Sequence, residues 1–299
     1  MSTTRPAREV VLKGARRLRR AEMGKRARGF LLYLVLSLLV VVFVAPFLWM
    51  ILASLKSTAQ IFAFPPRIIP NPVIWKNYAR AWSVIPLARF YLNSILVAGS
   101  VAFAQVVTSA MAAYVFARLY FPAKNLLFVI YLGVMMIPTQ VTVIPLFIIV
   151  RRLGLIDTYG ALILPFLAYP FGAFLLRQFF LTIPREIEDA AIADGCPRLR
   201  ILAQIIVPLS RSALVTLGML AFMFTWNSFF WPLLVTNTAD HFTIQVGLAM
   251  LRTQLVSAGG VDWSLLMAVT VISILPVLIF YVFAQKQIIR GITLTGLKM

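Results

Sequence analysis

The sequence predicts an all-α integral membrane protein with six transmembrane helices and a cytoplasmic two-helix loop, and three observations support this prediction. The chain of 299 residues is 61% hydrophobic and 12% charged, far from the composition of a soluble domain. It contains six uncharged runs, each about long enough to cross a hydrocarbon core of ~30 Å as a helix. Four of its nine acidic residues lie together in one polar interval, residues 183–209.

The six runs are the expected membrane spans, and none contains an Asp, Glu, Lys or Arg. In order they are residues 30–53, 90–117, 125–150, 158–176, 212–239 and 263–285. The third contains Pro138 and Pro145, and the fourth contains Pro165 and Pro170. Proline removes a backbone hydrogen bond, so we expect both to be broken helices. They either line a translocation path or are simply kinked.

The distribution of basic residues predicts the orientation in the membrane. With the amino terminus inside, 20 of the 28 Lys and Arg residues fall on the cytoplasmic side, which places both termini in the cytoplasm. Residues 1–29 carry ten of them and are interpreted as a flexible basic cytoplasmic tail near anionic headgroups, or as an orientation signal only. Because the remaining basic residues lie between spans, nucleic acid is not an expected partner.

The polar interval 183–209 predicts two short helices. Pro184 suits the start of the first, and Glu186, Glu188 and Asp189 favour the positive end of its dipole. Gly195 suits the left-handed residue that ends it.

Pro197 suits the first turn of the second short helix, and Pro208 is expected to begin the next span. Leu199, Leu202 and Ile206 recur at helical spacing and predict one apolar stripe. Such a pair of helices fits a groove on another protein, or is a solvated loop between spans.

Several kinds of chemistry lack the residues they need. The sequence has no Gly-x-x-x-x-Gly-Lys-[Ser/Thr] loop, one histidine and one cysteine, so we expect no ATP hydrolysis, no metal site and no catalytic residues in this chain. Asp157 is expected to cap the fourth span. His241 is expected to be a surface residue that opens a loop, 241–262, before the last span.

One stretch also carries a family resemblance. Asp189-Ala190-Ala191, then Asp194-Gly195, and later Val207-Pro208, resembles the EAA loop of permease subunits in binding-protein-dependent ATP-binding-cassette importers. Asp189 and Val207 stand where Glu and Leu are usual. The resemblance covers nearly the whole chain, from PFLWMILASLK (46–56) to RGITLTGLK (290–298). It is strongest to the carbohydrate branch, similar to the second permease subunit of maltose-type importers, although Ser228 stands where that branch often has Asp.

The resemblance implies a six-helix permease domain over residues 30–299 in a bacterial inner membrane. Its implied partners are a second permease subunit in a heterodimer, two cytoplasmic ATPase subunits and an extracytoplasmic solute-binding protein. The chain itself would bind no cofactor, because ATP and Mg²⁺ are bound by the ATPase subunits. The coupling loop would be residues 183–209, with contacts to an ATPase at Glu188, Asp189, Ala190, Ala191, Asp194, Gly195 and Pro208.

The resulting functional prediction is a permease subunit of an ATP-driven sugar or oligosaccharide importer. Candidates for the substrate path, chosen for polarity and ring stacking, are Met136, Gln140, Trp226, Asn227 and Trp231; helix packing is the alternative role for each. The alternative functions are a permease for glycerol-phosphate or another small polar solute, and an autonomous secondary carrier.

Overall fold

The structure, a computed structural model, describes the backbone of residues 5–257 and 260–296 and the side chains of residues 29–256, 260–283 and 285. Every regular element in this part of the chain is helical, as the sequence predicts. The chain divides into two units, Met1–Ile74 and Trp75–Met299.

The first unit is dominated by one helix, α1 (Arg5–Ser54). Its apolar part, Gly29–Ser54, is long enough to cross a membrane and matches the first expected span. The basic tail differs from the expectation of flexibility, because its backbone is helical from Arg5 onward. It is rich in Arg, Lys, Glu, Ala and Leu, which are strong helix formers. Its side chains up to residue 28 lie outside the described part.

A compact turn follows α1. It contains the short helix α2 (Thr58–Ile61), whose preceding residue Ser57 accepts a hydrogen bond from the Gln60 N–H. Lys56 donates from Nζ to the Arg67 carbonyl at 2.5 Å, and the same Nζ lies 4.5 Å from the centroid of the Trp49 ring.

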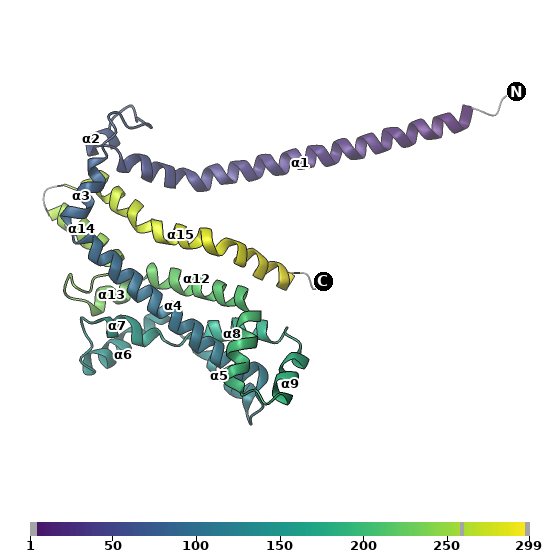
Figure 1. Ribbon diagram of the computed structural model, residues 1–299. Helices are drawn as coiled ribbons and strands as arrows, with labels where there is room; N and C mark the ends of the chain where they lie inside the picture. Colours follow the sequence, from purple (N-terminus) through teal and green to yellow (C-terminus); the bar gives the residue numbers. More distant parts are fainter. Residues whose placement is uncertain (1–4, 258–259, 297–299) are drawn as a thin grey trace. The chain divides into compact units, whose positions relative to one another are not determined.

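The scaffold of the second unit is a layer of long helices that lie side by side (Figure 1). α4 (Leu87–Arg118) packs against α12 (Arg211–Trp226), and α12 packs against α15 (Trp263–Gly296). α8 (Pro170–Phe180) crosses α4. A Cβ at Gly172 would lie 2.4 Å from Ser109 Oγ and 3.0 Å from a Leu217 methyl, so glycine is needed where α8 meets α4 and α12.

The third and fourth expected spans are broken helices, as their prolines predict. The third consists of α5 (Lys124–Gly133) with η1 (Val134–Met136), followed by α6 (Thr139–Arg152) at an angle of 95°. The fourth consists of α7 (Tyr159–Ile163) with η2 (Leu164–Phe166), followed by α8 at 43°. The breaks occur at Pro138 and ahead of Pro170, whereas Pro145 lies inside α6 without ending it.

Polar side chains on α4 bind three backbone carbonyls at the break before α8. Gln105 Nε2 donates to the Phe166 carbonyl at 2.9 Å, and Thr108 Oγ1 donates to the Leu167 carbonyl at 2.7 Å. Ser109 Oγ donates to the Tyr169 carbonyl at 3.3 Å. Because unpaired carbonyls are costly in lipid, α4 makes the broken span tolerable.

The polar interval contains four short helical elements, α9 (Arg185–Ala193), α10 (Arg198–Ile201), η3 (Leu202–Ile206) and α11 (Val207–Leu209). A bend of 85° at Ser210 separates them from α12. Three of the described helices are long and apolar enough to cross a membrane by themselves. If each of the three bent helix pairs counts as one span, the number of possible spans is up to six. Pro208 lies in α11, ahead of the bend, and does not begin the fifth span as expected.

Two boundaries near the end of the chain also differ from the sequence prediction. The fifth span was expected to reach residue 239, but α12 ends at Trp226 and a separate helix, α13 (Phe230–Val235), follows. The expected loop 241–262 contains a helix, α14 (Ile244–Ser257), which packs against α4 and α15. Its apolar contacts include Leu251 and Ile244 in one core cluster with Phe90 of α4 and Leu265 of α15. Burial of this apolar face explains why the segment is helical.

Candidate functional site

The two-helix loop turns sharply at Gly195, as predicted. Gly195 has φ +77°, its N–H donates to the Ile192 carbonyl, and the Cys196 N–H donates to the Ala191 carbonyl, each at 2.9 Å. These two bonds form the Schellman motif that ends many helices. A Cβ at Gly195 would meet no atom within 4 Å, so the turn needs glycine for its backbone conformation and not for space.

Glu188 points inward, although it was grouped with residues that contact an ATPase. Its side chain is 5% exposed. Glu188 Oε1 accepts a hydrogen bond from the Tyr114 hydroxyl at 2.6 Å and from Arg198 Nη1 at 3.0 Å, and Oε2 lies 3.4 Å from Arg118 Nε. The carboxylate therefore joins α9 to the last turns of α4 and to α10.

The guanidinium of Arg118 also binds two backbone carbonyls beside Glu188. Its Nη2 donates to the carbonyls of Phe180 and Ile183, each at 2.7 Å, and its side chain is 3% exposed. These carbonyls lie at the end of α8 and in the turn that leads to α9. One guanidinium thus gathers α4, the end of α8 and α9.

The outer face of the loop carries the remaining coupling candidates. Asp189, Ala190, Asp194 and Gly195 are exposed, and Ala191 is half-buried. Three large apolar side chains on the same two helices are also exposed: Ile187, Ile192 and Leu199. The face therefore combines apolar groups with carboxylates, a composition suited to contact with another protein.

The predicted apolar stripe of the second short helix is wrong at one position. Leu202 and Ile206 are buried together with Ile201, but Leu199 is 71% exposed. Leu199 lies in the first turn of α10, ahead of η3, on the side of that turn opposite to the buried Ile201 and Leu202.

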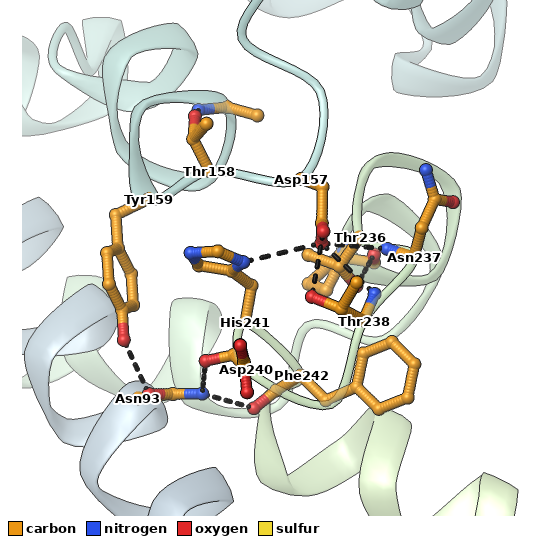
Figure 2. A network of polar contacts seen from close by, with 12 residues as sticks. Asn93, Asp157, Thr158, Tyr159, Thr236, Asn237, Thr238, Asp240, His241 and Phe242 are labelled. Atoms are coloured by element: carbon orange, nitrogen blue, oxygen red, sulfur yellow. Dashed lines mark hydrogen bonds and ion pairs between the residues drawn. The ribbon is translucent and has the colours of Figure 1, made fainter.

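A second polar network lies at the opposite end of α4 (Figure 1, Figure 2). Asp157 was expected to cap α7, but Thr158 is the cap and accepts a hydrogen bond from the Ala161 N–H. Asp157 has φ +58° and turns its carboxylate to the loop after α13. It accepts hydrogen bonds from the N–H groups of Asn237 and Thr238 and from the Thr238 hydroxyl.

The network also includes the histidine and the start of α4. His241 Nδ1 lies 3.4 Å from Asp157 Oδ1, and its side chain is 26% exposed, less than expected for a surface residue. Asn93 donates from Nδ2 to the carbonyls of Asp240 and Phe242 and accepts from the Tyr159 hydroxyl, as Figure 2 shows. Three segments distant in sequence are thereby fixed to one another.

The Asp157 carboxyl is held in its charged form. Burial raises its pKa, but the hydrogen bonds from Asn237 and Thr238 and the nearby His241 outweigh burial, so the pKa lies below its usual value. Sequence inspection did not find this role, because the partners lie about 80 residues away.

Two of the five substrate-path candidates are core residues. Trp226 is 2% exposed, donates from Nε1 to the Ser273 carbonyl at 3.1 Å, and stacks on Phe222. Trp231 is 6% exposed and donates from Nε1 to the Ala161 carbonyl at 2.9 Å. Both rings pack helices together, which was the alternative role for each.

The other three candidates are exposed. Asn227 follows the end of α12, where its Nδ2 donates to the Met223 carbonyl. It lines an open hollow of about 450 Å³ with Leu220, Met223, Phe224 and Ser228. Met136 and Gln140 lie on either side of the break at Pro138. The structure does not bring all five candidates into one site.

A larger hollow was not anticipated from the sequence. It has a volume of about 660 Å³ and lies over α14 and α15. Its polar lining is Gln245, Arg252, Thr253 and Thr270. The segment that carries most of these residues was expected to be a loop, which is why no pattern pointed to them.

Comparison with known proteins gives consistent matches over most of the chain. The model of the family described as "binding-protein-dependent transport system inner membrane component" matches residues 105–293. A probable ABC transporter permease protein, YurM of Bacillus subtilis, is 35% identical over 257 residues, covering 85% of this chain and 83% of that protein.

Other relatives are named for their solutes. The sn-glycerol-3-phosphate transport system permease protein UgpE of Yersinia pestis is 30% identical, with 87% of this chain and 93% of that protein covered. The diacetylchitobiose uptake system permease protein NgcG of Streptomyces coelicolor is 30% identical, with 85% of this chain and 83% of that protein covered. In fold, the chain is similar to a chain of a bacterial ABC transporter involved in alginate import. The TM-score is 0.78 and the identity 23%, and the match covers 87% of this chain and 96% of that chain.

Proposed function

The chain belongs to the family of inner-membrane components of binding-protein-dependent transport systems, and from that premise we propose that it is the permease subunit of an ATP-driven importer of a sugar or oligosaccharide. Subunits of this family are membrane-spanning permeases and are not themselves the enzymes of the system. The observation that carries the proposal is the exposed face of the two-helix loop, which lies at one end of α4 and offers apolar and acidic groups to a partner.

The partner at this face is an ATPase subunit in our proposal. Asp189, Ala190, Ala191, Asp194 and Gly195 sit in an ATPase groove, and Pro208 helps set the bend that leads to α12. Closure of two ATPase subunits on ATP and Mg²⁺ then moves the loop and alternates the access of the permease. Glu188 does not belong to this contact surface, because it is buried.

The complete transporter contains a second permease subunit and an extracytoplasmic solute-binding protein. The two-helix loop and both termini face the cytoplasm, in agreement with the excess of basic residues on that side. The polar network around Asp157, at the far end of α4, then faces outward.

A carbohydrate substrate is supported by one relative named for diacetylchitobiose uptake. The hollow at the end of α12 has a polar group, Asn227, beside apolar ones, as sugar sites commonly do. A second candidate substrate is glycerol-phosphate, since relatives named for sn-glycerol-3-phosphate match at 30% identity.

The test is uptake by the transporter reconstituted in liposomes with its ATPase and binding-protein partners. We expect ATP-dependent accumulation of a radiolabelled sugar, and we expect Asn227→Ala to change its concentration dependence while Trp226→Phe affects only stability. Accumulation of glycerol-phosphate instead would favour the second substrate. Uptake by this chain alone, without ATP, would establish an autonomous carrier and contradict the proposal.

A further inference from the structure

The buried carboxylate of Glu188 lies outside the exposed surface proposed to contact an ATPase, yet it makes more polar contacts than any other acidic group described in the loop. It binds Tyr114, Arg118 and Arg198, which come from two different elements. Burying a carboxylate is costly unless it is paired and hydrogen-bonded. A residue needed only to keep the loop soluble would be exposed, as Glu186 is on the same helix.

We propose that Glu188 is the positioning residue that fastens the coupling loop to α4, so that α4 follows the movement that an ATPase imposes on the loop. This rests on the proposed function, because it assigns a transmission path to the same coupling surface. Tyr114 and Arg118 make the connection to α4, whereas Arg198 joins Glu188 to α10 within the loop.

The geometry favours α4 as the receiving helix. Tyr114 and Arg118 are one helical turn apart and present their side chains to the same carboxylate. Arg118 also holds the carbonyls of Phe180 and Ile183, so the end of α8 and the start of the loop are bound to the same turn of α4. A displacement of α9 therefore moves α4 and α8 together.

α4 reaches both ends of the second unit. From Asn93 to Arg118 it extends about 37 Å at 1.5 Å per residue. At its far end, Asn93 holds the loop carbonyls of Asp240 and Phe242, and Ser94 Oγ accepts from the Ile244 N–H. A rigid helix fastened by polar groups at both ends can carry a displacement from the coupling loop to the opposite face.

The contact between Arg118 and Glu188 is longer than a hydrogen bond in this structure. Arg118 Nε lies 3.4 Å from Glu188 Oε2 and makes no hydrogen bond to the described residues. Charge-assisted N–H to O contacts are ordinarily about 2.7–2.9 Å long. Arg118 Nε is therefore an ion-pair partner of Glu188 and not a hydrogen-bond donor to it.

Arg198 is the one accessible member of the group. Its side chain is 52% exposed, against 3% for Arg118 and 5% for Glu188. A docked partner can therefore reach the group only through Arg198. Glu188 and Arg118 are shielded from solvent in this structure.

The test compares Glu188→Gln with Glu186→Gln in the assembled transporter, reconstituted with its ATPase and binding-protein partners. Glutamine keeps the size of Glu188 and an acceptor for Tyr114 but removes the charge that balances two guanidinium groups. We expect Glu188→Gln to lower the amount of solute imported per ATP hydrolysed by about tenfold or more, with ATP hydrolysis retained. Glu186→Gln should leave this ratio unchanged.

A spectroscopic readout separates positioning from simple loss of stability. Spin labels on α4 and α9, at Val115→Cys and Arg185→Cys in a Cys196→Ser background, are both at exposed positions. We expect one narrow distance distribution with and without ATP, and a broadened distribution in Glu188→Gln. Tyr114→Phe, which removes a single hydrogen bond, should give a smaller change in the same direction if Glu188→Gln fails to assemble.

The outcomes are distinct. A wild-type import-to-ATP ratio in Glu188→Gln, or an α4–α9 distance that changes with ATP in the unmutated transporter, would overturn the positioning role. An unmutated transporter that shows no ATP-dependent uptake would overturn the proposed function instead, whatever the spin labels report.

Discussion

Individual residues in this protein act mainly through backbone conformation and buried charge. Gly195 is needed because its φ is +77°, a conformation that costs most side chains about 1–2 kcal/mol. Glu188 is paired, and Asp157 is held in its charged form, by groups from distant segments. At this scale, the environment of a residue matters more than its type.

We predict that Gly195→Val weakens coupling while leaving membrane insertion intact. Valine has space at this position but cannot adopt the left-handed conformation cheaply, so the turn between α9 and α10 is distorted. Gly195→Asn, which tolerates that conformation, is the matched control and should retain most activity. The measurement is solute uptake per ATP in the reconstituted transporter. An equal loss of solute uptake per ATP in both variants would show that any side chain at this position, and not the backbone conformation, causes the defect.

We also predict acid sensitivity from Asp157. Its pKa is lowered in the folded protein, so its contribution to stability is complete above the usual value of about 4 and is lost as the pH falls through the lower folded pKa. Asp157→Asn should lower the melting temperature at neutral pH, and the melting temperature of this variant should fall less steeply as the pH is lowered. Asp240→Asn is the control, because its ion pair with Arg89 is exposed. An unchanged pH profile in Asp157→Asn would contradict this assignment.

At the scale of elements, the broken helices depend on α4. At the break between η2 and α8, side chains of α4 bind the carbonyls of Phe166 and Leu167, and a third, Ser109, adds a bond to the Tyr169 carbonyl, which also accepts from the Ala173 N–H. The sequence indicates the break through Pro165 and Pro170 but not the groups that compensate for it. A break of this kind is thus a property of two helices together.

We predict that Gln105→Leu and Thr108→Val each destabilise the protein by roughly 1 kcal/mol, because each leaves one partly buried carbonyl without its side-chain donor. Met111→Leu, on an exposed part of the same helix, is the control. Thermal unfolding of the purified protein in detergent measures the difference. Melting temperatures equal to that of the control would show that the carbonyls find other partners.

At the scale of the whole molecule, the second unit has two polar ends joined by α4. The two-helix loop lies at one end and the Asp157 network at the other (Figure 1, Figure 2). The basic residues predict which end faces the cytoplasm. The single cysteine, Cys196, lies in the two-helix loop and provides a natural probe of this orientation.

We predict that a membrane-impermeant maleimide labels Cys196 in inverted membrane vesicles and not in right-side-out vesicles. A variant with Cys196→Ser and Asn237→Cys, which moves the thiol to an exposed position in the Asp157 network, should show the opposite pattern. Labelling is measured by the mass shift of the purified chain. The reverse result for both proteins would place the termini outside.

The sequence alone was sufficient for the fold class and the turn at Gly195, since hydropathy, charge and turn chemistry are properties of neighbouring residues. The family was predicted from the resemblance of residues 189–208 to the EAA loop, and the family model confirms it. It did not predict α14, the early end of α12 or the exposure of Leu199. It also could not distinguish Glu188 from Asp189, its neighbour in the same helix. Only the tertiary structure decides that Glu188 faces inward, because the partner that fixes it, Tyr114, is 74 residues away.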